Sequence, residues 1–299
     1  MGDTIMKHHT TARLKFIGSM AIFGTLAIFV RNIDVSSGEL ALYRALLAAM
    51  LLSLYFLISG QNLNLREIRH ELPLLFLSGA AMGFNWILLF QSYRYTTVSI
   101  ATLSYYFAPV IVTAVCPILF RERLTFKQIS CSVMATAGLV LVVLFQKDGE
   151  TAGAESHFIG VLFGLGAAVF YATVIILNKF IKNVSGIHRT FFQFIASIIV
   201  LVPYVLLTDG VNLSNLDGLG WGCLITAGLL HTGITYCMYF SSLKDLSGQE
   251  AAILSYIDPL VAVIVSVAVL GEGISAPQIA GGILILGFTL WNELGGKKT

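Results

Sequence analysis

The stretch from Gly83 to Ile129 returns without a gap 150 residues later, as Gly233 to Ile279. Ten of its 47 positions are identical in the two copies. The spaced matches are Tyr106, Pro109, Glu122, Gln128 and Ile129 in the first copy and Tyr256, Pro259, Glu272, Gln278 and Ile279 in the second. Apolar segments often match by chance, so identities among Ala and Val count for little, and the ungapped spacing counts for much more. The sequence therefore predicts an internal duplication.

The composition indicates a membrane protein. Hydrophobic residues make up 57% of the chain and charged residues 11%, and the mean hydropathy is +0.84. A soluble domain carries about 25% charged residues. The net charge of +2 is too small to indicate a nucleic-acid partner. The four cysteines lie inside apolar segments without metal-binding spacing, so we expect neither a metal nor a cofactor. They are Cys116, Cys131, Cys223 and Cys237.

Ten apolar segments are long enough to cross a bilayer, which takes roughly 20 residues of helix. They span residues 14–31, 38–59, 72–92, 97–120, 126–146, 158–178, 187–207, 218–242, 248–270 and 276–294. The connections are short, and none could fold as a soluble domain. The predicted fold class is an all-α membrane protein with ten transmembrane helices in two inverted five-helix repeats.

The duplication divides the chain into two sets of five helices. Residues 1–146 form the first repeat, residues 147–157 form a polar extracytoplasmic linker, and residues 158–299 form the second repeat. The N-terminus is polar and leads straight into a long apolar segment without a small-residue cleavage site. We therefore expect the first helix to be retained rather than removed as a signal peptide.

The distribution of Lys and Arg predicts the orientation, because short cytoplasmic loops carry an excess of both. With the N-terminus inside, fourteen of these residues fall in inside loops and three in outside loops. The inside set is Lys7, Arg13, Lys15, Arg66, Arg69, Arg121, Arg123, Lys127, Lys179, Lys182, Arg189, Lys244, Lys297 and Lys298, and the outside set is Arg31, Arg94 and Lys147. We expect a multi-pass protein of the cytoplasmic membrane with both termini in the cytoplasm.

An odd number of helices in each repeat makes the second repeat enter the membrane in the opposite sense to the first. The charges agree, because Arg94 falls outside and its repeat image Lys244 falls inside. Inverted repeats are a transporter architecture, in which the binding site lies near the bilayer midplane and the repeats move to give alternating access.

Ten helices in this arrangement, with a Pro-x12-Glu pattern at Pro109 and Glu122 and again at Pro259 and Glu272, resemble the drug/metabolite transporter superfamily, EamA type. The resemblance covers nearly the whole chain. It implies that helices 3, 4, 8 and 9 form a central cavity, that helices 1, 2, 6 and 7 surround it, and that helices 5 and 10 lie outside. It also implies transport of small metabolites such as amino acids, drugs or sugars, commonly outward.

Asp258 is the polar residue that most needs an explanation, since a charge at the bilayer centre costs at least about 2.5–3.5 kcal/mol. It lies near mid-depth in the ninth segment. Pro259 follows it directly and frees the carbonyl of Ser255, which is tolerated where it lines a cavity. An acid beside a free carbonyl suits an ammonium group or a shuttled proton. The alternative is a structural acid locked to an arginine, a tyrosine or a histidine.

His231 is the second candidate, near mid-depth in the eighth segment. Helical spacing places Thr235 on the same face. An unperturbed histidine titrates near neutrality, so His231 could sense or pass protons. The alternative, which we weigh equally, is a neutral histidine bonded to a carbonyl in the core.

Polar and aromatic residues of the inner helices complete the predicted substrate site. They are Asn85, Trp86, Ser104, Tyr105, His231, Thr235, Ser255 and Asp258. Helical spacing sets Tyr106 about 200° away from the position that matches Asp258, so we expect Tyr105 rather than Tyr106 in the cavity. Aromatic walls with few polar groups are usual for small-molecule pockets, although each ring alone could serve helix packing.

Four further charged residues receive structural or gating interpretations. Glu122 and Glu272 close the two Pro-containing helices, and we interpret both as scaffold or gate residues. Glu250 begins the ninth segment, where the helix dipole favours an acid. Arg44 lies in the outer leaflet, where it could pair with an acid or bind a substrate carboxylate, and its expected repeat image is Gln193.

The sequence favours a secondary transporter, with Asp258 and His231 as candidates for proton coupling. A sugar-phosphate or nucleotide-sugar carrier would need several deep cations, and only Arg44 is available. A membrane-embedded sensor or enzyme is the alternative, but the loops leave no room for an output domain. There is no P-loop and no catalytic motif. The expected partners are a small-molecule substrate and the bilayer, with the chain a monomer or a homodimer.

Overall fold

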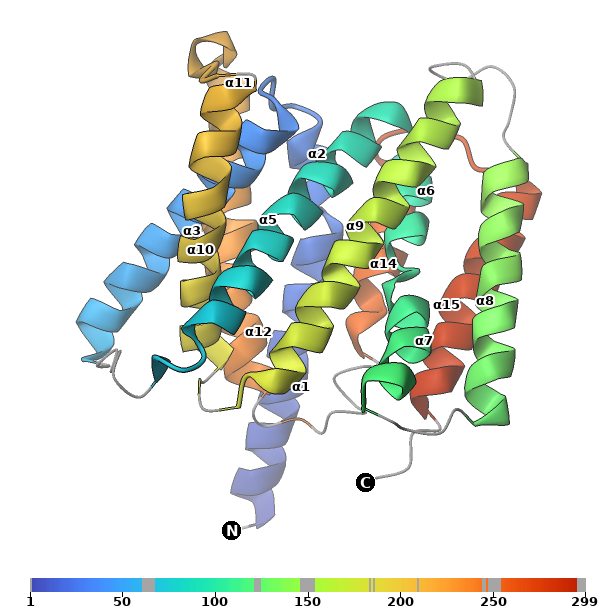
Figure 1. Cartoon of the computed structure of the whole chain (residues 1–299), viewed down its shortest axis with the longest axis horizontal. Helices are drawn as coiled ribbons and strands as arrows, with labels where there is room; N and C mark the ends of the chain where they lie inside the picture. Colours follow the sequence, from blue (N-terminus) through green and yellow to red (C-terminus); the bar gives the residue numbers. More distant parts are fainter. Residues whose placement is uncertain are drawn as a thin grey trace.

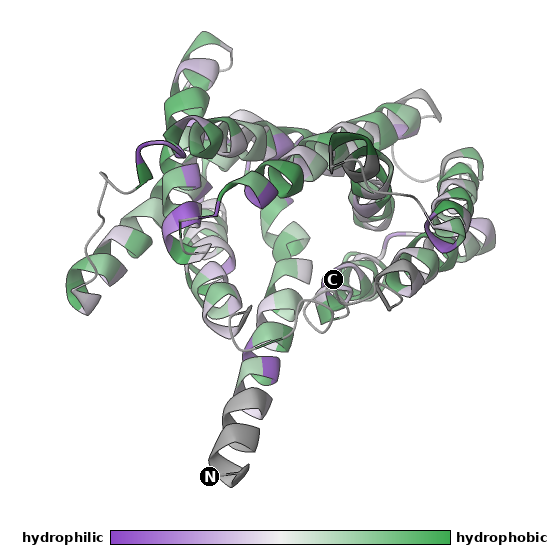
Figure 2. Cartoon of the chain, turned by 60° about the horizontal axis from the view of Figure 1, so that its bottom comes forward, coloured by the Kyte–Doolittle hydropathy of each residue, from purple (hydrophilic) through white to green (hydrophobic). Residues whose placement is uncertain are grey.

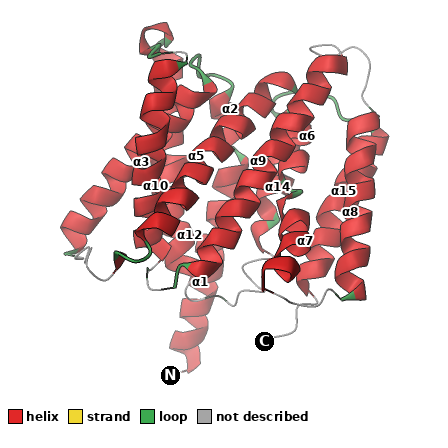
Figure 3. Ribbon diagram, viewed as in Figure 1, coloured by secondary structure: helices red, strands yellow, loops and turns green. Residues whose placement is uncertain are grey.

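The computed structural model describes residues 2–60, 68–120, 125–145, 154–182, 184, 186–208, 210–243, 246 and 254–294. Within these ranges the regular structure is helical and contains no strand (Figure 3). The predicted all-helical class is therefore confirmed. Glu122, Glu250 and most of the predicted linker lie outside the described residues.

The helices follow the chain in the order expected from its apolar segments (Figure 1). They are α1 (Gly2–Gly24), α2 (Leu26–Val30), α3 (Ser37–Ser59), α5 (Leu72–Tyr95), α6 (Val98–Tyr105), α7 (Ala108–Phe120), α8 (Phe126–Leu144), α9 (Ala154–Phe180), α10 (Gly186–Leu207), the short 3-10 turn η1 (Leu213–Asn215), α11 (Gly218–Thr226), the π-helix η2 (Ala227–Ile234), α12 (Thr235–Leu243), α14 (Ile257–Ala268) and α15 (Ala276–Leu294).

In the part of the chain that the structure describes, seven helical stretches are long and apolar enough to cross a membrane. They are Thr10–Val30, Ser37–Ser59, Leu72–Tyr95, Val98–Val115, Ser156–Phe180, Gly186–Leu207 and Gly218–Ser242. Three shorter apolar helices, Phe126–Val142, Ile257–Ala268 and Ala276–Trp291, fall in the remaining predicted segments. Hydrophobic residues cover most of each helix (Figure 2). The chain is a multi-pass membrane protein, and the arrangement of ten spans in two repeats stays a prediction.

Both termini lie at the same end of the helical bundle (Figure 1). The turn between α2 and α3 and the segment around η1 lie at the opposite end. These ends are called the terminal end and the far end below. The positions of Lys and Arg predict that the terminal end faces the cytoplasm.

The repeated glutamines cap helices. Thr125 and Gln128 form a reciprocal capping box at the start of α8, in which the Gln128 carbonyl oxygen accepts from the Thr125 backbone N–H at 2.8 Å. Ser275 and Gln278 make the same pair of bonds at the start of α15, and the matching distance is 2.9 Å. A capping box satisfies amides that have no partner within the helix. The identity of Gln128 and Gln278 in the repeat is therefore explained by local folding.

Two glycines separated by 150 residues pack against two leucines with the same separation. A Cβ added to Gly83 in α5 would lie 3.3 Å from the Leu201 side chain in α10. A Cβ added to Gly233 in η2 would lie 3.2 Å from the Leu51 side chain in α3. Small residues let helices approach closely. These matched contacts are what the predicted duplication requires.

The peripheral pair consists of α8 and α15, which lie together at one edge of the bundle (Figure 1). Their backbones approach at two glycines, since a Cβ on Gly138 would lie 2.6 Å from the Gly281 oxygen and the converse distance is 2.5 Å. A side chain at either position would collide with the backbone of the other helix, so only glycine permits this approach. The pair therefore packs within the monomer through Gly281.

Candidate functional site

Four segments depart from a continuous α-helix in the interior of the bundle. The first helix is interrupted at Thr25, between α1 and α2. The fourth segment breaks at Tyr106 and Phe107, between α6 and α7, and the ninth turns at Tyr256 before α14 begins. The eighth contains the π-helix η2. Broken helices are tolerated inside a membrane where they line a cavity or find protein partners, and transporter sites are built from them.

The two breaks before proline have a common cause. Pro109 is the second residue of α7 and Pro259 is the third residue of α14. Proline cannot donate a helical hydrogen bond, and its ring crowds the preceding turn. Both predicted kinks therefore occur as breaks in the helix, two to three residues before the proline.

A central cavity of about 480 Å³ lies among these interruptions. Its lining includes Leu26 and Tyr93, and also Asn178 and Arg189, near the end of α9 and the start of α10, which lie at the terminal end (Figure 1). Five of the eight predicted substrate-binding residues line it, and they are Asn85, Trp86, Tyr105, Ser255 and Asp258. Arg44 and Pro109 line it as well.

Asp258 is held by contacts from two other segments. The Tyr106 hydroxyl donates a hydrogen bond to Asp258 Oδ2 at 2.8 Å. Gly24, at the end of α1, packs directly on the Asp258 backbone, since a Cβ added there would lie 2.6 Å from the Asp258 carbonyl oxygen. The carboxylate therefore sits where the first, fourth and ninth segments are all interrupted.

Tyr105 lines the cavity as expected, whereas the expectation that Tyr106 lies away from it is wrong. Both residues line it, and Tyr106 is the one that bonds Asp258. Tyr106 is the residue after the end of α6, with φ −71° and ψ 7°. Because the helix stops there, the angle of 100° per residue that separated the two side chains no longer applies.

Aromatic rings form a continuous wall beside the acid. The Tyr105 ring lies 5.1 Å from Tyr171 and 5.7 Å from Tyr106, between centroids. Tyr106 lies 6.5 Å from its repeat image Tyr256. Tyr171 and Tyr236 were missed as site residues, although both line the cavity. Neither carried a sequence signal, because tyrosine in an apolar helix serves packing as readily as binding.

Arg44 forms part of the wall and is also tied to the scaffold. Its Nε donates to Thr232 Oγ1 at 3.0 Å, and its guanidinium lies 5.0 Å from the ring centroids of Trp86 and Phe90. No hydrogen bond or ion pair joins Arg44 to Asp258 in the part of the chain that the structure describes. Of the partners named for a structural acid, Arg44 is therefore not the one observed, whereas a tyrosine, Tyr106, is.

His231 does not line the cavity. Its Nε2 lies 3.0 Å from Thr25 Oγ1 and its Nδ1 lies 3.4 Å from the Thr226 carbonyl oxygen. The ring packs on Phe29 with centroids 4.6 Å apart. The side chain is 1% exposed. His231 thus occupies a polar contact between the interrupted first segment and η2, which is the core role that we weighed as the alternative.

Two other predicted site residues point elsewhere. Thr235 is buried and donates to the Leu230 carbonyl oxygen at 2.6 Å. Ser104 is buried against α9, where a Cβ on Gly164 would lie 2.8 Å from the Ser104 Cβ. Asn85, in contrast, lines the cavity while its amide donates to the Ala167 carbonyl oxygen at 2.7 Å.

Glu272 lies outside the central cavity, at the far end of the bundle. Its carboxylate forms an ion pair with Arg31 at 2.5 Å and accepts from the Val98 backbone N–H at 2.7 Å. The scaffold or gate interpretation fits this position, whereas its repeat image Glu122 lies outside the described residues. Among the described side chains, no group of three or more His, Cys, Asp or Glu could hold a metal ion.

The cavity combines one carboxylate, its tyrosine partner and several aromatic faces. A carboxylate attracts an ammonium group, and aromatic faces attract cations and cover apolar surface. The Arg44 guanidinium also lines the cavity and provides the opposite charge, without an ion pair to Asp258 among the described residues. The geometry suits a small molecule with a cationic amine.

The comparisons with known proteins agree over the whole chain. The profile of the EamA-like transporter family matches residues 11–144 and 158–292. An uncharacterized transporter of Bacillus subtilis (strain 168), YxxF, is 30% identical over 93% of this chain and 88% of its own length. An uncharacterized transporter of Archaeoglobus fulgidus is 29% identical over 92% of this chain and 94% of its own length.

More distant similarities point to the same fold. A probable biotin transporter of Pseudomonas aeruginosa is 22% identical over 72% of this chain and 75% of its own length. A solved crystal structure superimposes with a TM-score of 0.67 and 17% identity, covering 96% of this chain and 99% of the other. The broken inner helices, the central cavity and the family match together lead to one conclusion: this chain belongs to the EamA-like transporter family.

Proposed function

We propose that the chain is a secondary transporter that exports small amino-bearing metabolites, amino acids or amines, across the cytoplasmic membrane by alternating access. The observation that carries this proposal is Asp258, an acid that lines the cavity and is bonded by a tyrosine rather than neutralised by an arginine. A buried charge of this kind needs a functional reason. A substrate ammonium group supplies one.

The surroundings of Asp258 favour a substrate with an apolar or aromatic body. Tyr105, Tyr106 and Tyr171 stand in ring contact along one wall. Such rings contribute to binding through apolar contact and through attraction of a cation to the ring face. Arg44, on the other side of the cavity, would accept a substrate carboxylate, so amino acids and amines both fit.

Substrate binding can be coupled to protons or to exchange through the same acid. In the proton mode, Asp258 releases a proton when the amine binds and takes one up after release. In the exchange mode, Asp258 always leaves with an amine bound. Proteoliposomes loaded with a pH-sensitive dye distinguish the two, since only the proton mode moves protons in fixed ratio to substrate.

The probable biotin transporter of Pseudomonas aeruginosa, one of the relatives, suggests a competing substrate class. Biotin carries a carboxylate and no amine, so a biotin carrier would use Arg44 and would not need Asp258. Biotin therefore belongs in the substrate panel as the test of this alternative.

The experiment is substrate uptake into proteoliposomes that contain wild type or Asp258→Asn. The matched control is Asp34→Asn, because Asp34 is an exposed acid at the far end of the bundle. We expect Asp258→Asn to abolish transport of the amine while the purified protein remains folded, and we expect the control to transport normally. Full transport by Asp258→Asn would overturn the proposal.

A further inference from the structure

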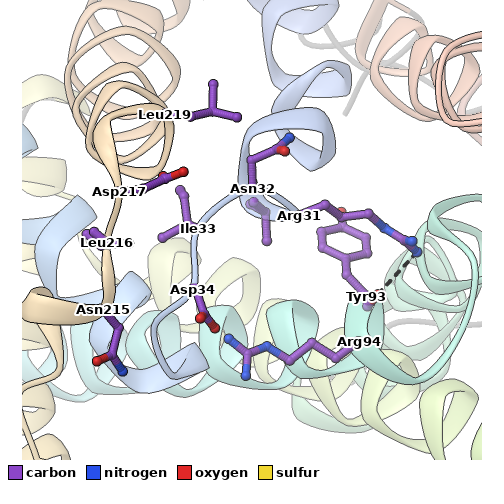
Figure 4. Close-up of a pocket in the computed structure, with 11 residues that line it drawn as sticks. Arg31, Asn32, Ile33, Asp34, Tyr93, Arg94, Asn215, Leu216, Asp217 and Leu219 are labelled. Carbon is purple, nitrogen blue, oxygen red and sulfur yellow. Dashed lines mark hydrogen bonds between the residues drawn. The ribbon is translucent and has the colours of Figure 1, made fainter.

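A second cavity lies at the far end of the bundle and shares a wall with the central one. It measures about 670 Å³, and its lining includes Arg31, Asp34, Arg94 and Asp217 (Figure 4). We call it the outer vestibule. Tyr93 lines both the outer vestibule and the central cavity, so this part of the bundle separates the two spaces.

Arg31, in the first segment, contacts the partition, by which we mean the part of the bundle around Tyr93 that separates the two cavities. Its Nη2 donates to the Tyr93 carbonyl oxygen at 3.3 Å (Figure 4) and to the Thr96 carbonyl oxygen at 3.2 Å. The same nitrogen lies 2.5 Å from Glu272 Oε1. One guanidinium therefore connects the end of α2, the turn between α5 and α6, and the chain that follows α14.

Glu272, in the other predicted repeat, contacts both Arg31 and the start of α6. Gly271, with φ +66°, turns the chain back after α14, and the Glu272 N–H then donates to the Ser266 carbonyl oxygen at 3.0 Å. Glu272 Oε2 accepts from the first amide of α6, that of Val98, and from the Ser266 hydroxyl. Acids are stabilised at helix N-termini, where amides lack partners within the helix.

We propose that the ion pair between Arg31 and Glu272 is the gate that closes the central cavity toward the outer vestibule. This proposal rests on the proposed transport function. The pair ties the end of α2 to the chain after α14 beside Tyr93, which lines both spaces, so opening between them would separate the two residues. The cavity extends toward the terminal end, so the structure has the arrangement expected with this gate shut.

The two partners depend on the pair to different degrees. Arg31 is 36% exposed and could be solvated after separation, whereas Glu272 is 9% exposed. Glu272 Oε1 has no hydrogen-bond partner within the described residues, so the ion pair is the contact that serves it. Loss of the arginine would leave a buried oxygen unpaired, and the open state, in which water reaches it, would gain population.

Arg94 provides a matched control within the same vestibule. Its guanidinium donates to the Val35 carbonyl oxygen. Among the described residues, the ion pair at this end of the bundle is formed by Arg31 and not by Arg94. Substitution of Arg94 therefore removes the same charge from the vestibule and leaves the contact across the partition intact.

The test measures access to the central cavity from outside. The native cysteines are replaced by serine, and Thr102→Cys places a thiol of similar size in the wall of the central cavity. Intact cells are treated with a membrane-impermeant thiol reagent. We expect Arg31→Gln to raise the labelling rate about tenfold, the change produced by about 1.4 kcal/mol in a two-state equilibrium. Arg94→Gln should label at the parent rate.

Charge reversal provides the second measurement. We expect Arg31→Glu to label fast and Arg31→Lys, which keeps the cation and leaves Glu272 in place, to label near the parent rate. Parent-rate labelling in both Arg31→Gln and Arg31→Glu would overturn the gate. Labelling requires no substrate, so this experiment tests the gate even if the protein does not transport amines. The proteoliposome assay tests amine transport whether or not the Arg31–Glu272 pair is the gate.

Discussion

The two proline-containing segments have similar backbones and different chemistry. The first breaks at Tyr106 and Phe107 before Pro109, and the second turns at Tyr256 before Pro259. The residue preceding each proline differs, because Asp258 in the second copy replaces Ala108 in the first. The acid thus enters at a position where the two copies differ, whereas Tyr106, which bonds it, has a matching tyrosine in the other copy.

The third and eighth segments diverge in their backbones. The third is the continuous helix α5, whereas the eighth contains the π-helix η2. Three side chains of the eighth segment contact carbonyls five residues back, and they are His231, Thr232 and Thr235. π-Helical turns occur frequently at functional sites. The second predicted repeat therefore carries both the acid and the irregular helix.

The largest effect is expected where the first segment meets Asp258. Gly24→Ala would bring a Cβ within 2.6 Å of the Asp258 carbonyl oxygen and 2.7 Å of Val261 Cβ. Overpacking of this kind costs about 1–3 kcal/mol. We expect a lower midpoint of thermal unfolding in detergent and strongly reduced transport.

Gly18→Ala is the control for this prediction, on the same helix. Its added Cβ would lie 3.5 Å from Met238 Cε, an ordinary contact. Equal effects of the two substitutions would mean that the close approach to Asp258 has no special role.

A smaller effect is expected from the hydrogen bond that links the two breaks. Tyr106→Phe removes the donor to Asp258. A hydrogen bond to a charged group contributes about 1.5–3 kcal/mol, so we expect at least about a tenfold change in amine affinity. Equilibrium binding to purified protein measures it. Tyr105→Phe is the comparison, because it retains the ring in the cavity wall, and a larger effect there would restore our original expectation.

The smallest effects should be equal in the two copies. Gln128→Ala and Gln278→Ala each remove one capping box. Loss of a cap costs about 0.5–2 kcal/mol, and unfolding in detergent should show it with amine affinity unchanged. A loss of affinity in one copy alone would show that the repeated glutamines do more than cap helices.

The sequence predicted what depends on local pattern. The helical segments and the kinks near Pro109 and Pro259 follow from apolar length and proline chemistry. The position of Tyr106 could not be predicted, because helical geometry does not extend across a break. The direction of the His231 side chain could not be predicted either. His231 lies in a π-helix, where side chains do not follow the period of 3.6 residues that the prediction assumed.

Contacts between residues far apart in the chain could not be predicted from the sequence either. Arg31 looked like an ordinary loop arginine, and nothing in its neighbourhood indicated that it meets Glu272, 241 positions later. Arg44 and Asp258 carry opposite charges in one cavity, and only the fold shows that they stand apart. Such pairings are set by how the two halves pack.

The most direct test of the account is a thermal-shift panel on detergent-purified wild type and Asp258→Asn. The ligands are amino acids, amines, sugars, cationic dyes and biotin, each at two pH values. A ligand that binds only the folded state stabilises it by about 2.7 kcal/mol at a hundredfold excess over Kd. We predict a shift for amine-bearing ligands that is lost in Asp258→Asn. The same shift in wild type and in the variant would contradict the central claim that Asp258 binds the substrate.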